Sequence, residues 1–477
     1  MDAMEKRDAD EKQPLAFLLD GSISYTSMRG NNPGQRMPCT KKRLDDQDFF
    51  PSHDSRLHDT EEDSLSVFLV GLRTPDESVP RAQLRLQELD SLVRTAGMEP
   101  LGARILPLRT GRAATLIGSG QALEIKELAE YHAADAIVFD RDIPPRAQRN
   151  LEDIIGLPIH DRQGIIITIF GQRASTKEAV LQVELARLHY VLPRLTGSRE
   201  DLSRQQGGVK GTRGGGEAQL ELDRRRISDR IACLKTELTA VRTRRERQRT
   251  QRKSGEIPVG AIVGYTNSGK SSLLKALSGA DILVEDKLFA TLDPTTRRIR
   301  LPESGEVLLS DTVGFVSDLP HHLVDAFRST LEEATDADFL VIVCDASHPD
   351  MLSCYQATLD VLHNMGADGK PTVTMLNKMD VPFEDFAVAK LRDMIPDLVE
   401  TSIKKRQGLN ALLEAMAKAA YASCPLRSFL IPADRHDLVS RTRQSGRIET
   451  LEYTDDGILL SARLIPVMLG DFLPFQQ

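Results

Sequence analysis

From about residue 64 the chain alternates between hydrophobic runs and helical repeats. SVFLVGLR (66–73) is a continuous apolar run typical of a buried strand, and RAQLRLQELDSLVRTAG (81–97) has helical spacing and ends on a glycine. The alternation continues through ARILPLR, GQALEIKELAEYH, ADAIVFD and PPRAQRNLEDIIG to a short strand near LPIHDR. Alternating strands and helices predict a parallel sheet with helices on its faces. We therefore expect an N-terminal parallel α/β domain over residues 64–168.

The next part of the chain contains two long helical repeats on either side of a glycine-rich segment, GGVKGTRGGGEAQLE (207–221). Apolar residues recur at helical spacing within each repeat: Leu181, Leu185, Leu188, Leu192 and Leu195, then Leu220, Ile227, Ile231, Leu234, Leu238 and Val241. Two such helices joined by a loop pair best in antiparallel fashion, with one apolar seam against the other. We expect a helical hairpin over residues 169–254 with the glycine-rich segment at its tip.

The two ends of the chain differ from these patterns. Residues 1–63 are polar, and their composition predicts a disordered extension. The C-terminal stretch RHDLVSRTRQSGRIETLEYTDDGILLSARL predicts a helix followed by a β-hairpin around DDG, in a small α+β domain over residues 425–477.

Composition narrows the class of protein. A length of 477 residues suggests about three domains plus connections. The five cysteines lie far apart with no Cys/His cluster, which favours reduced thiols in a cytosolic protein. An opening of mixed charge and the lack of a run of about 18 apolar residues argue against a signal peptide and a membrane span. We expect a cytoplasmic monomer, with peripheral membrane association left open.

The charge is unevenly distributed. The whole chain has a net charge of −8, yet residues 203–253 hold fifteen basic and six acidic residues. Such runs are most often a solvated helix face. RRRISDR and RTRRERQRTQRK contain mostly basic residues, which would suit binding to a polyanion such as RNA. The two interpretations remain open on charge alone.

The clearest chemical motif begins at IPVGAIVGYTNSGKSSLLKAL. A hydrophobic strand leads into Gly264-x4-Gly269-Lys270-Ser271, and an apolar-periodic helix follows, which is the context of a phosphate-binding P-loop. Its backbone N–H groups would surround the phosphates at the positive end of the helix. Lys270 would neutralise the β and γ phosphates, and the Ser271 hydroxyl would ligate Mg²⁺.

A second motif selects the base. After an apolar strand, Asn377-Lys378-x-Asp380 supplies a carboxylate that can accept from both N1–H and the exocyclic amine of guanine. Adenine offers no such pair of donors, so the motif favours GTP. The loop of Ser402, Ile403 and Lys404 stands where GTPases bind the guanine O6 through backbone N–H groups, although alanine is usual at position 403.

The third motif is DTVGF, in which a strand ends at Asp311 and Gly314 follows three residues later. Asp311 would hold the Mg²⁺ shell, and the Gly314 N–H would meet the γ-phosphate. Upstream, KLFATLDPTTR suits a switch I loop. Its Thr291, Thr295 and Thr296 are alternatives for the second Mg²⁺ hydroxyl, and composition does not choose among them.

One residue type is missing from this set. Ras-like GTPases place a glutamine after the DxxG glycine to orient the attacking water, whereas this chain has Phe315. Phenylalanine neither donates nor accepts a hydrogen bond. We therefore expect slow intrinsic hydrolysis that a partner raises by ordering the switches or supplying a missing group.

Together, GYTNSGKSSL, DKLFATLDPTTR, DTVGF and NKMD resemble the HflX family, translation-factor-related GTPases of bacteria. The resemblance extends to DRQGIIITIFGQRASTKEAVLQVELARLHY and GTRGGGEAQLELDRRRI, and covers roughly residues 65–465. Within the glycine-rich segment, Gly215 stands where the family has proline and Ala218 where it has threonine. The resemblance implies four parts: the α/β domain, the antiparallel hairpin, a Ras-like P-loop GTPase domain (residues 255–424) and the small C-terminal domain.

The resemblance also implies residue roles. It assigns Thr291 as the switch I ligand of Mg²⁺ beside Ser271, and Lys270, Thr291 and Gly314 as the catalytic set. The nucleotide contacts that the motifs and the resemblance imply are Gly264, Tyr265, Thr266, Asn267, Ser268, Gly269, Lys270, Ser271, Phe289, Ala290, Thr291, Leu292, Asp293, Asp311, Thr312, Val313, Gly314, Asn377, Lys378, Met379, Asp380, Ser402, Ile403 and Lys404.

For function, the resemblance implies a ribosome-associated GTPase that binds the large subunit and its 23S rRNA and dissociates stalled or idle 70S ribosomes, notably under stress. Lys210 and Arg213 in the hairpin tip would meet rRNA phosphates or bases. Hydrolysis would then release the factor. The alternatives are a ribosome-assembly GTPase and an RNA-binding regulatory switch with negligible turnover.

Overall fold

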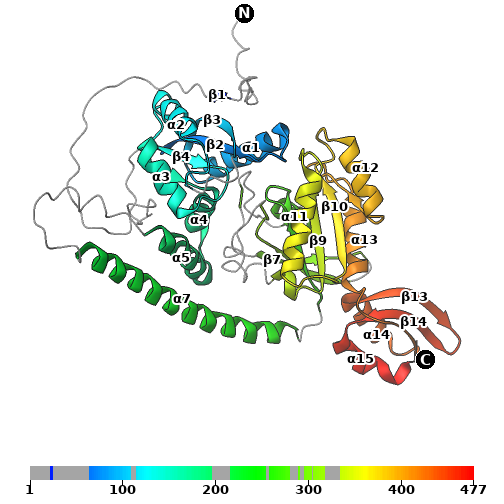
Figure 1. Cartoon of the computed structure of the whole chain (residues 1–477). Coiled ribbons are helices and arrows are strands. Elements are labelled where there is room, and N and C mark those ends of the chain that lie inside the picture. The colour runs from blue at the N-terminus through cyan, green and yellow to red at the C-terminus, as the bar shows by residue number, and fades with distance from the viewer. Residues whose placement is uncertain are drawn as a thin grey trace, which may run out of the picture. The chain divides into compact units, whose positions relative to one another are not determined.

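The computed structural model describes residues 22–24, 64–108, 114–195, 215–253, 257–279, 288–289, 295–302, 305–316 and 333–476. The side chains described in the long helix 215–253 are those of residues 221–241 and 243. The chain divides into two compact units, residues 1–166 and 167–477, and Figure 1 colours their elements in chain order.

The first unit is built on a sheet in the order β1-β3-β2-β4-β5. Its elements are β1 (Ser22–Ser24), β2 (Ser66–Arg73), α1 (Val79–Thr95), β3 (Glu99–Pro107), α2 (Ser119–Tyr131), β4 (Ala136–Phe139), α3 (Pro145–Ile155) and β5 (Ile159–His160). The strands β3, β2, β4 and β5 are parallel, which confirms the predicted α/β fold.

Both faces of this sheet are covered. Phe68, Val70 and Leu72 on one face of β2 belong to a core that also takes in residues of α2 and α3. On the opposite face, a Cβ at Gly71 would contact Leu86 of α1 at 3.6 Å. Burial on both faces explains why β2 is a continuous apolar run rather than an alternating one.

The carboxyl ends of β2 and β4 are held together by a buried ion pair. The Asp140 carboxylate, which is fully buried, accepts from the Leu72 N–H at 2.9 Å and from Arg85 Nε at 2.7 Å. Arg85 also pairs with Glu77. Burial raises the pKa of Asp140, and Arg85 opposes that rise. Open α/β sheets commonly bind ligands at this edge. Here the side chains of Asp140, Arg85 and Glu77 occupy the edge and pair with one another.

One feature differs from the sequence-based expectations. Ser22–Ser24, within the segment expected to be disordered, form the strand β1, which pairs antiparallel with β3. The division between the two units falls within helix α4 (Arg162–Arg173), between residues 166 and 167 and close to the expected domain end at residue 168. The apolar run IIITIF continues the helix because its side chains are buried on both sides of that position.

The second unit begins with the hairpin of α5 (Lys177–Val191) and α7 (Gly215–Lys253). Leu181 packs against Leu234 and Leu238, while Glu184 bonds Arg230 at 2.8 Å. Later positions of α5 therefore meet earlier positions of α7, so the helices are antiparallel, as predicted. The contact is shorter than the predicted seam, because α5 is 15 residues long and α7 is 39.

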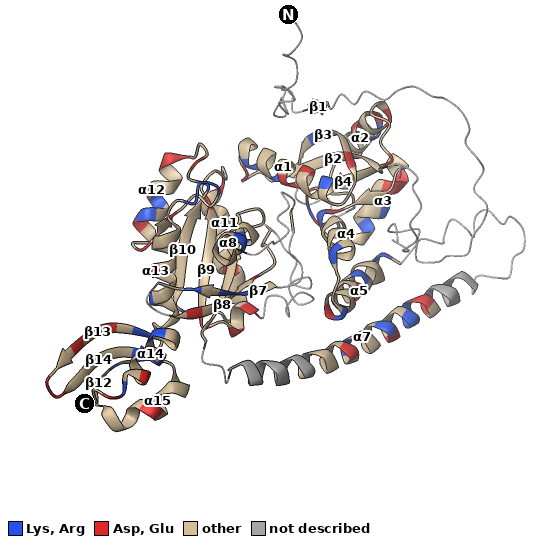
Figure 2. Ribbon diagram, turned by 180° about the vertical axis from the view of Figure 1, so that it is seen from behind, with Lys and Arg blue, Asp and Glu red and all other residues tan. Residues whose placement is uncertain are grey.

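Charge along the described part of α7 is nearly balanced. Residues 221–241 carry five basic and four acidic side chains, and Figure 2 shows the two signs interleaved along the helix. Arg226 pairs with Asp223, and Arg230 with Glu184. The basic excess of the hairpin therefore belongs mainly to residues 203–214 and 242–253.

The next part of this unit is a six-stranded sheet in the order β11-β10-β9-β6-β8-β7, parallel except for β7. Its elements are β6 (Val259–Gly264), α8 (Lys270–Ser278), β7 (Thr295–Arg300), β8 (Glu306–Asp311), β9 (Phe339–Asp345), α11 (Met351–Asn364), β10 (Thr372–Asn377), α12 (Asp385–Met394), β11 (Val399–Glu400) and α13 (Leu409–Ala420).

The C-terminal part is a three-stranded antiparallel sheet in the order β12-β14-β13 with two helices. It comprises β12 (Leu426–Ile431), α14 (His436–Ser445), β13 (Gly446–Thr454), β14 (Gly457–Leu464) and α15 (Pro466–Phe472), with the hairpin turn at DDG as predicted. One hydrophobic cluster joins Met416 and Tyr421 to Phe429 and Phe472, so this part shares a core with the six-stranded sheet.

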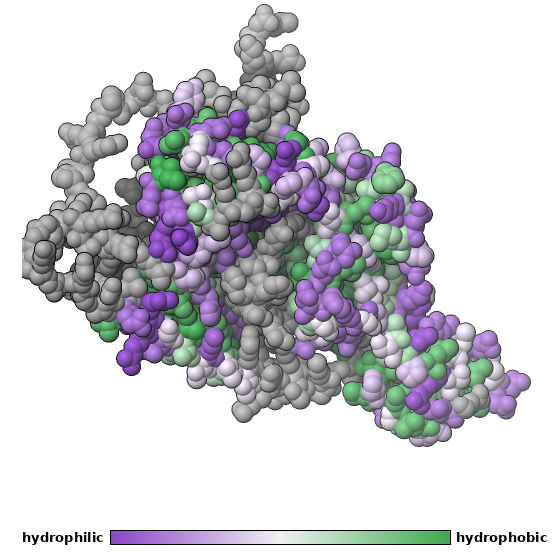
Figure 3. Space-filling view, in the orientation of Figure 1, coloured by the Kyte–Doolittle hydropathy of each residue, from purple (hydrophilic) through white to green (hydrophobic). Residues whose placement is uncertain are grey.

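On the face shown in Figure 3, hydrophilic and hydrophobic residues are interspersed over the described parts of both units. None of the helices in those parts combines the length and the apolar run that a bilayer span requires.

Candidate nucleotide-binding site

The loop between β6 and α8 is a tight cradle at the carboxyl edge of the six-stranded sheet. Its backbone has positive φ at Gly264, Asn267 and Gly269. A Cβ at Gly264 would lie 2.4 Å from the Val343 carbonyl oxygen, and one at Gly269 would lie 2.4 Å from Asn377 Nδ2. The two motif glycines are therefore required by both backbone conformation and close packing.

Lys270, the first residue of α8, lies inside the cradle. Its side chain is buried, and Nζ donates to the Tyr265 carbonyl oxygen at 2.8 Å. Burial lowers the pKa of Lys270 to about 8, and the Asp311 carboxylate opposes this shift. A buried ammonium beside backbone N–H groups is well placed to receive phosphate charge.

The neighbouring Ser271 meets the end of β8. Ser271 Oγ donates to Asp311 Oδ2 at 2.6 Å, and Asp311 is buried. The register that pairs Ile262 of β6 with Asp311 fixes this approach. Thr312, also a predicted nucleotide contact, donates its hydroxyl to the Ile262 carbonyl oxygen at 2.7 Å, and Val313 is buried.

Gly314 stands directly against the cradle. A Cβ at this position would meet Thr266 Cγ2 at 2.7 Å and Lys270 Nζ at 2.9 Å. A side chain here would therefore displace the lysine or the loop. The close approach brings the end of the DTVG segment, the P-loop and Lys270 to one point, where we expect the γ-phosphate.

Phe315, the residue in the glutamine position, is fixed in place. Its N–H donates to the Gly264 carbonyl oxygen at 3.1 Å, and its carbonyl oxygen accepts from the Thr266 N–H at 2.7 Å. The side chain is 1% exposed. This residue is therefore part of the packing between the P-loop and the segment after Asp311.

The proposed base-binding residues form a second cluster linked to the first. Asn377 donates from Nδ2 to the Ser268 carbonyl oxygen at 2.9 Å, and its Oδ1 accepts from the Ile403 N–H at 3.2 Å. Ser402 Oγ donates to Asp380 Oδ1 at 2.6 Å and thereby lowers the pKa of Asp380. The Asp380 carboxylate is thus kept ionised and oriented as an acceptor.

Sequence analysis missed one partner in this cluster. Lys378 Nζ pairs with Asp345 Oδ2 at 2.7 Å. Asp345 ends the apolar strand β9, so it lies at the same sheet edge as Asp311 and Asn377. The sequence does contain a signal for Asp345, because a polar residue at the carboxyl end of a buried parallel strand often belongs to a ligand site. Met379 donates its N–H to the Thr401 carbonyl oxygen.

Several predicted residues cannot be compared. Ala290, Thr291, Leu292 and Asp293 lie outside the described residues, as do Lys210 and Arg213 of the hairpin tip. Of the other switch I alternatives, Thr295 pairs with Asp311 in the β7–β8 register, and Thr296 Oγ1 lies 2.8 Å from Ser310 Oγ.

Phe289, a predicted nucleotide contact, also makes an aromatic contact. Its ring packs against Phe170 of α4 with centroids 4.7 Å apart, and its side chain is 2% exposed. The sequence-based expectation placed it in a loop next to the nucleotide. The two aromatic residues are far apart in the sequence, so no local sequence pattern predicts their contact.

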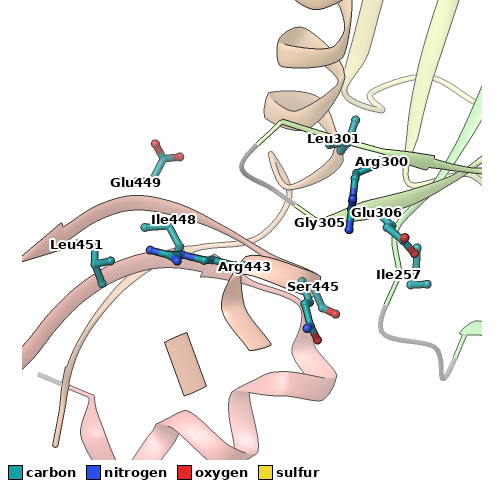
Figure 4. Close-up of a pocket in the computed structure, with 11 residues that line it drawn as sticks. Ile257, Arg300, Leu301, Gly305, Glu306, Arg443, Ser445, Ile448, Glu449 and Leu451 are labelled. Carbon is teal, nitrogen blue, oxygen red and sulfur yellow. The ribbon is translucent and has the colours of Figure 1, made fainter. Parts of the chain in front are cut away.

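A large cavity among the described residues of this unit is remote from the motifs. It has a volume of about 890 Å³ between the β7–β8 turn and the α14–β13 connection, and Figure 4 shows Arg300 and Arg443 among its lining residues. Its described lining contains none of the predicted site residues. A smaller cavity of about 20 Å³ adjoins Tyr265 and Thr266.

Strand β6 leads through a glycine-rich loop into a helix that begins with Lys-Ser. Asp311 and the Asn377–Asp380 cluster lie at the same edge of the sheet. These features together define a P-loop GTPase. Comparisons with known proteins agree. Residues 259–378 match the family model described as 50S ribosome-binding GTPase, residues 83–171 match GTP-binding GTPase N-terminal, and residues 173–252 match GTP-binding GTPase Middle Region.

Relatives extend the match over most of the chain. The GTPase HflX of Treponema denticola is 50% identical over 338 residues, which is 69% of this chain and 86% of the relative. The GTPase HflX of Akkermansia muciniphila is 43% identical over 412 residues, covering 84% and 94%. The chain therefore belongs to the HflX family of GTPases and is a GTP hydrolase.

Among solved structures, a GTP-binding protein from Sulfolobus solfataricus in complex with GDP is 24% identical with a TM-score of 0.40. The match covers 75% of this chain and 99% of that protein. This likeness is too distant to inform the site.

Lys270 makes nucleotide affinity depend on pH. Burial lowers the pKa of its ammonium to about 8 in the free protein, and bound phosphates favour the charged form, so binding takes up a proton above that pH. The affinity for GDP should fall as pH rises above about 8, approaching about tenfold per pH unit. Titration calorimetry in buffers of different ionisation enthalpy measures both affinity and proton uptake.

Lys275→Met, an exposed change on the same helix, should keep this dependence, whereas Lys270→Arg should lose it because a guanidinium does not titrate in this range. An affinity of the unaltered protein that stays constant over the same range would contradict the buried-lysine account.

Asp380 should determine base choice. In Asp380→Asn, an amide donor replaces one carboxylate acceptor, so the affinity for GDP should fall by about two orders of magnitude or more while the affinity for xanthosine diphosphate rises. Competition against a fluorescent nucleotide measures both. Asp385→Asn, at the start of α12, is the matched control. Unchanged guanine affinity in Asp380→Asn would show that the carboxylate does not contact the base.

Proposed function

We propose that this GTPase binds the large ribosomal subunit in its GTP form and dissociates stalled or idle 70S ribosomes, with hydrolysis driving its release. Membership of the HflX family supports ribosome association, as does the match of residues 259–378 to a 50S ribosome-binding GTPase model. The main structural support is the close approach of Gly314 to Thr266 and Lys270. Because these three residues meet at one point, their contacts can differ between the GTP-bound and GDP-bound forms.

The residues at the phosphate end fit a bound Mg²⁺. Ser271 Oγ and Asp311 Oδ2 lie 2.6 Å apart, and hydroxyl and carboxylate oxygens are the donors that Mg²⁺ takes in nucleotide sites. We assign Ser271 and Thr291 as its protein ligands, with Asp311 holding the surrounding shell. The ion, when bound with GTP, neutralises phosphate charge.

The chain's own residues then act as a switch. Lys270 holds the β and γ phosphates, Gly314 offers its N–H to the γ-phosphate, and Thr291 closes switch I over the site. Asn377, Asp380 and the Ser402–Lys404 loop hold the guanine. Loss of the γ-phosphate removes the contacts of Gly314 and Thr291, which returns the switches to their free state.

The hairpin would form the ribosome-binding element. Helices α5 and α7 pack antiparallel, and the glycine-rich segment lies between them in the sequence. We propose that Lys210 and Arg213 in that segment contact 23S rRNA, and that the bulk of the docked hairpin favours separation of the subunits. The protein would act in the cytoplasm as a monomer.

Sedimentation of 70S ribosomes tests this function. With the protein and either GTP or a nonhydrolysable analogue, the 70S peak should decrease and free subunits should increase, whereas GDP should leave 70S intact. Lys210→Ala with Arg213→Ala should weaken splitting while GTP affinity is unchanged, because the tip contacts RNA and not nucleotide.

Lys390→Ala with Lys418→Ala removes the same charge from α12 and α13 and serves as the control. Binding to 70S without splitting would favour a regulatory RNA-binding switch, and selective binding to precursor subunits would favour an assembly GTPase. Loss of GTP affinity in the tip variant would place the tip in the nucleotide site instead.

A further inference from the structure

The phosphate cradle contains a hydroxyl group with no assigned role. Thr266 is 6% exposed, and its Oγ1 is buried without a hydrogen-bond partner. A buried hydroxyl without a partner costs free energy, so its position calls for a ligand that supplies one. Ser268 Oγ is likewise buried and without a hydrogen-bond partner. The positions of the two side chains therefore decide which of them lies nearer the expected γ-phosphate.

Their surroundings separate these two hydroxyl groups. A Cβ at Gly314 would meet Cγ2 of Thr266 at 2.7 Å and its Cα at 2.8 Å. The Thr266 side chain is therefore beside the glycine expected to meet the γ-phosphate. Ser268 Oγ lies 3.3 Å from a Cβ built at Gly264, on the side of the loop that approaches the Val343 carbonyl of β9. Of the two residues, Thr266 is thus the one whose side chain lies beside Gly314, and its hydroxyl shares Cβ with the methyl group that makes this contact.

The usual water-orienting position is closed by the same contacts. Both backbone groups of Phe315 are hydrogen-bonded to the P-loop, to Gly264 and to Thr266 itself. Bringing any group at position 315 toward the γ-phosphate would break both bonds and expose a buried ring. The loop residue that bonds the Phe315 carbonyl oxygen is therefore the same one whose side chain lies beside Gly314.

We propose that Thr266 is a further catalytic residue for GTP hydrolysis, with its hydroxyl contacting the attacking water. The hydroxyl has one donor and two acceptor positions. It donates to a γ-phosphate oxygen and accepts from the water, which turns the water's lone pair toward phosphorus. The water oxygen bonds to phosphorus, the bond to the β–γ bridging oxygen breaks, and the water protons remain with inorganic phosphate. Thr266 stays protonated throughout.

A competing account is that the hydroxyl serves only the small cavity beside it. That cavity, about 20 Å³, is large enough for about one water and is also lined by Asp345, His348 and Thr358. Thr358 is a matched control, because it is buried in the same cavity and its hydroxyl donates to the Cys354 carbonyl oxygen at 2.9 Å. The proposal concerns hydrolysis itself and holds whether or not the GTP form separates ribosomes.

Single-turnover hydrolysis and nucleotide affinity test the proposal. Thr266→Val preserves shape and removes the hydroxyl, so hydrolysis without ribosomes should slow by about tenfold or more, while affinities for GTP and GDP stay within about twofold. Thr266→Ser restores the hydroxyl and should recover the rate to within about threefold. Thr358→Val should hydrolyse GTP at the unaltered rate.

Three results would overturn the assignment. An unchanged hydrolysis rate in Thr266→Val would show that the hydroxyl has no part in hydrolysis and serves only the small cavity. A rate in Thr266→Ser as low as in Thr266→Val would show that the methyl group's packing against Gly314 matters instead. A parallel loss of GTP and GDP affinity in Thr266→Val would make Thr266 a part of the phosphate cradle only.

Discussion

The site depends on a short backbone ladder between the P-loop and the segment after Asp311. The Thr266 N–H and the Gly264 carbonyl are both bonded to Phe315. The resulting parallel bridge between Tyr265 and Phe315 lies beyond the last β6–β8 pair, Ile262 with Asp311. It holds Gly314 close to Lys270, and so joins the P-loop to the segment in which we expect the γ-phosphate contact.

A second link ties the cradle to the base-binding residues. The Asn377 side chain bridges the Ser268 carbonyl oxygen and the Ile403 N–H, and the close approach of Gly269 leaves no space between them. The P-loop and the Asn377–Asp380 motif are therefore linked at one edge of the same sheet, where β9 lies between β6 and β10. Position 315 adds no polar side chain to this arrangement, because the Phe315 ring is buried and its backbone bonds the P-loop. We therefore expect unaided hydrolysis to be slow.

The motifs of the site could be predicted because their chemistry is local. Gly264 to Ser271 and Asn377 to Asp380 each depend on a few consecutive residues after a strand, so spacing alone reveals them. The α/β alternation and the leucine seam of the hairpin are likewise periodic. The Phe170–Phe289 contact and the Asp345–Lys378 pair join distant positions, and the continuation of α4 past residue 168 depends on packing from both sides. Such features have no signature in a window of sequence.

The central claim is that the free protein is built to bind GTP and to hydrolyse it slowly until a ribosome acts on its switches. Single-turnover hydrolysis of bound GTP, measured with and without purified 70S ribosomes or large subunits, tests this most directly. The account predicts a slow rate for the free protein and a rise of about tenfold or more on either particle, as expected when a partner completes a transition-state contact. Equal rates in the presence and absence of ribosomes would contradict it.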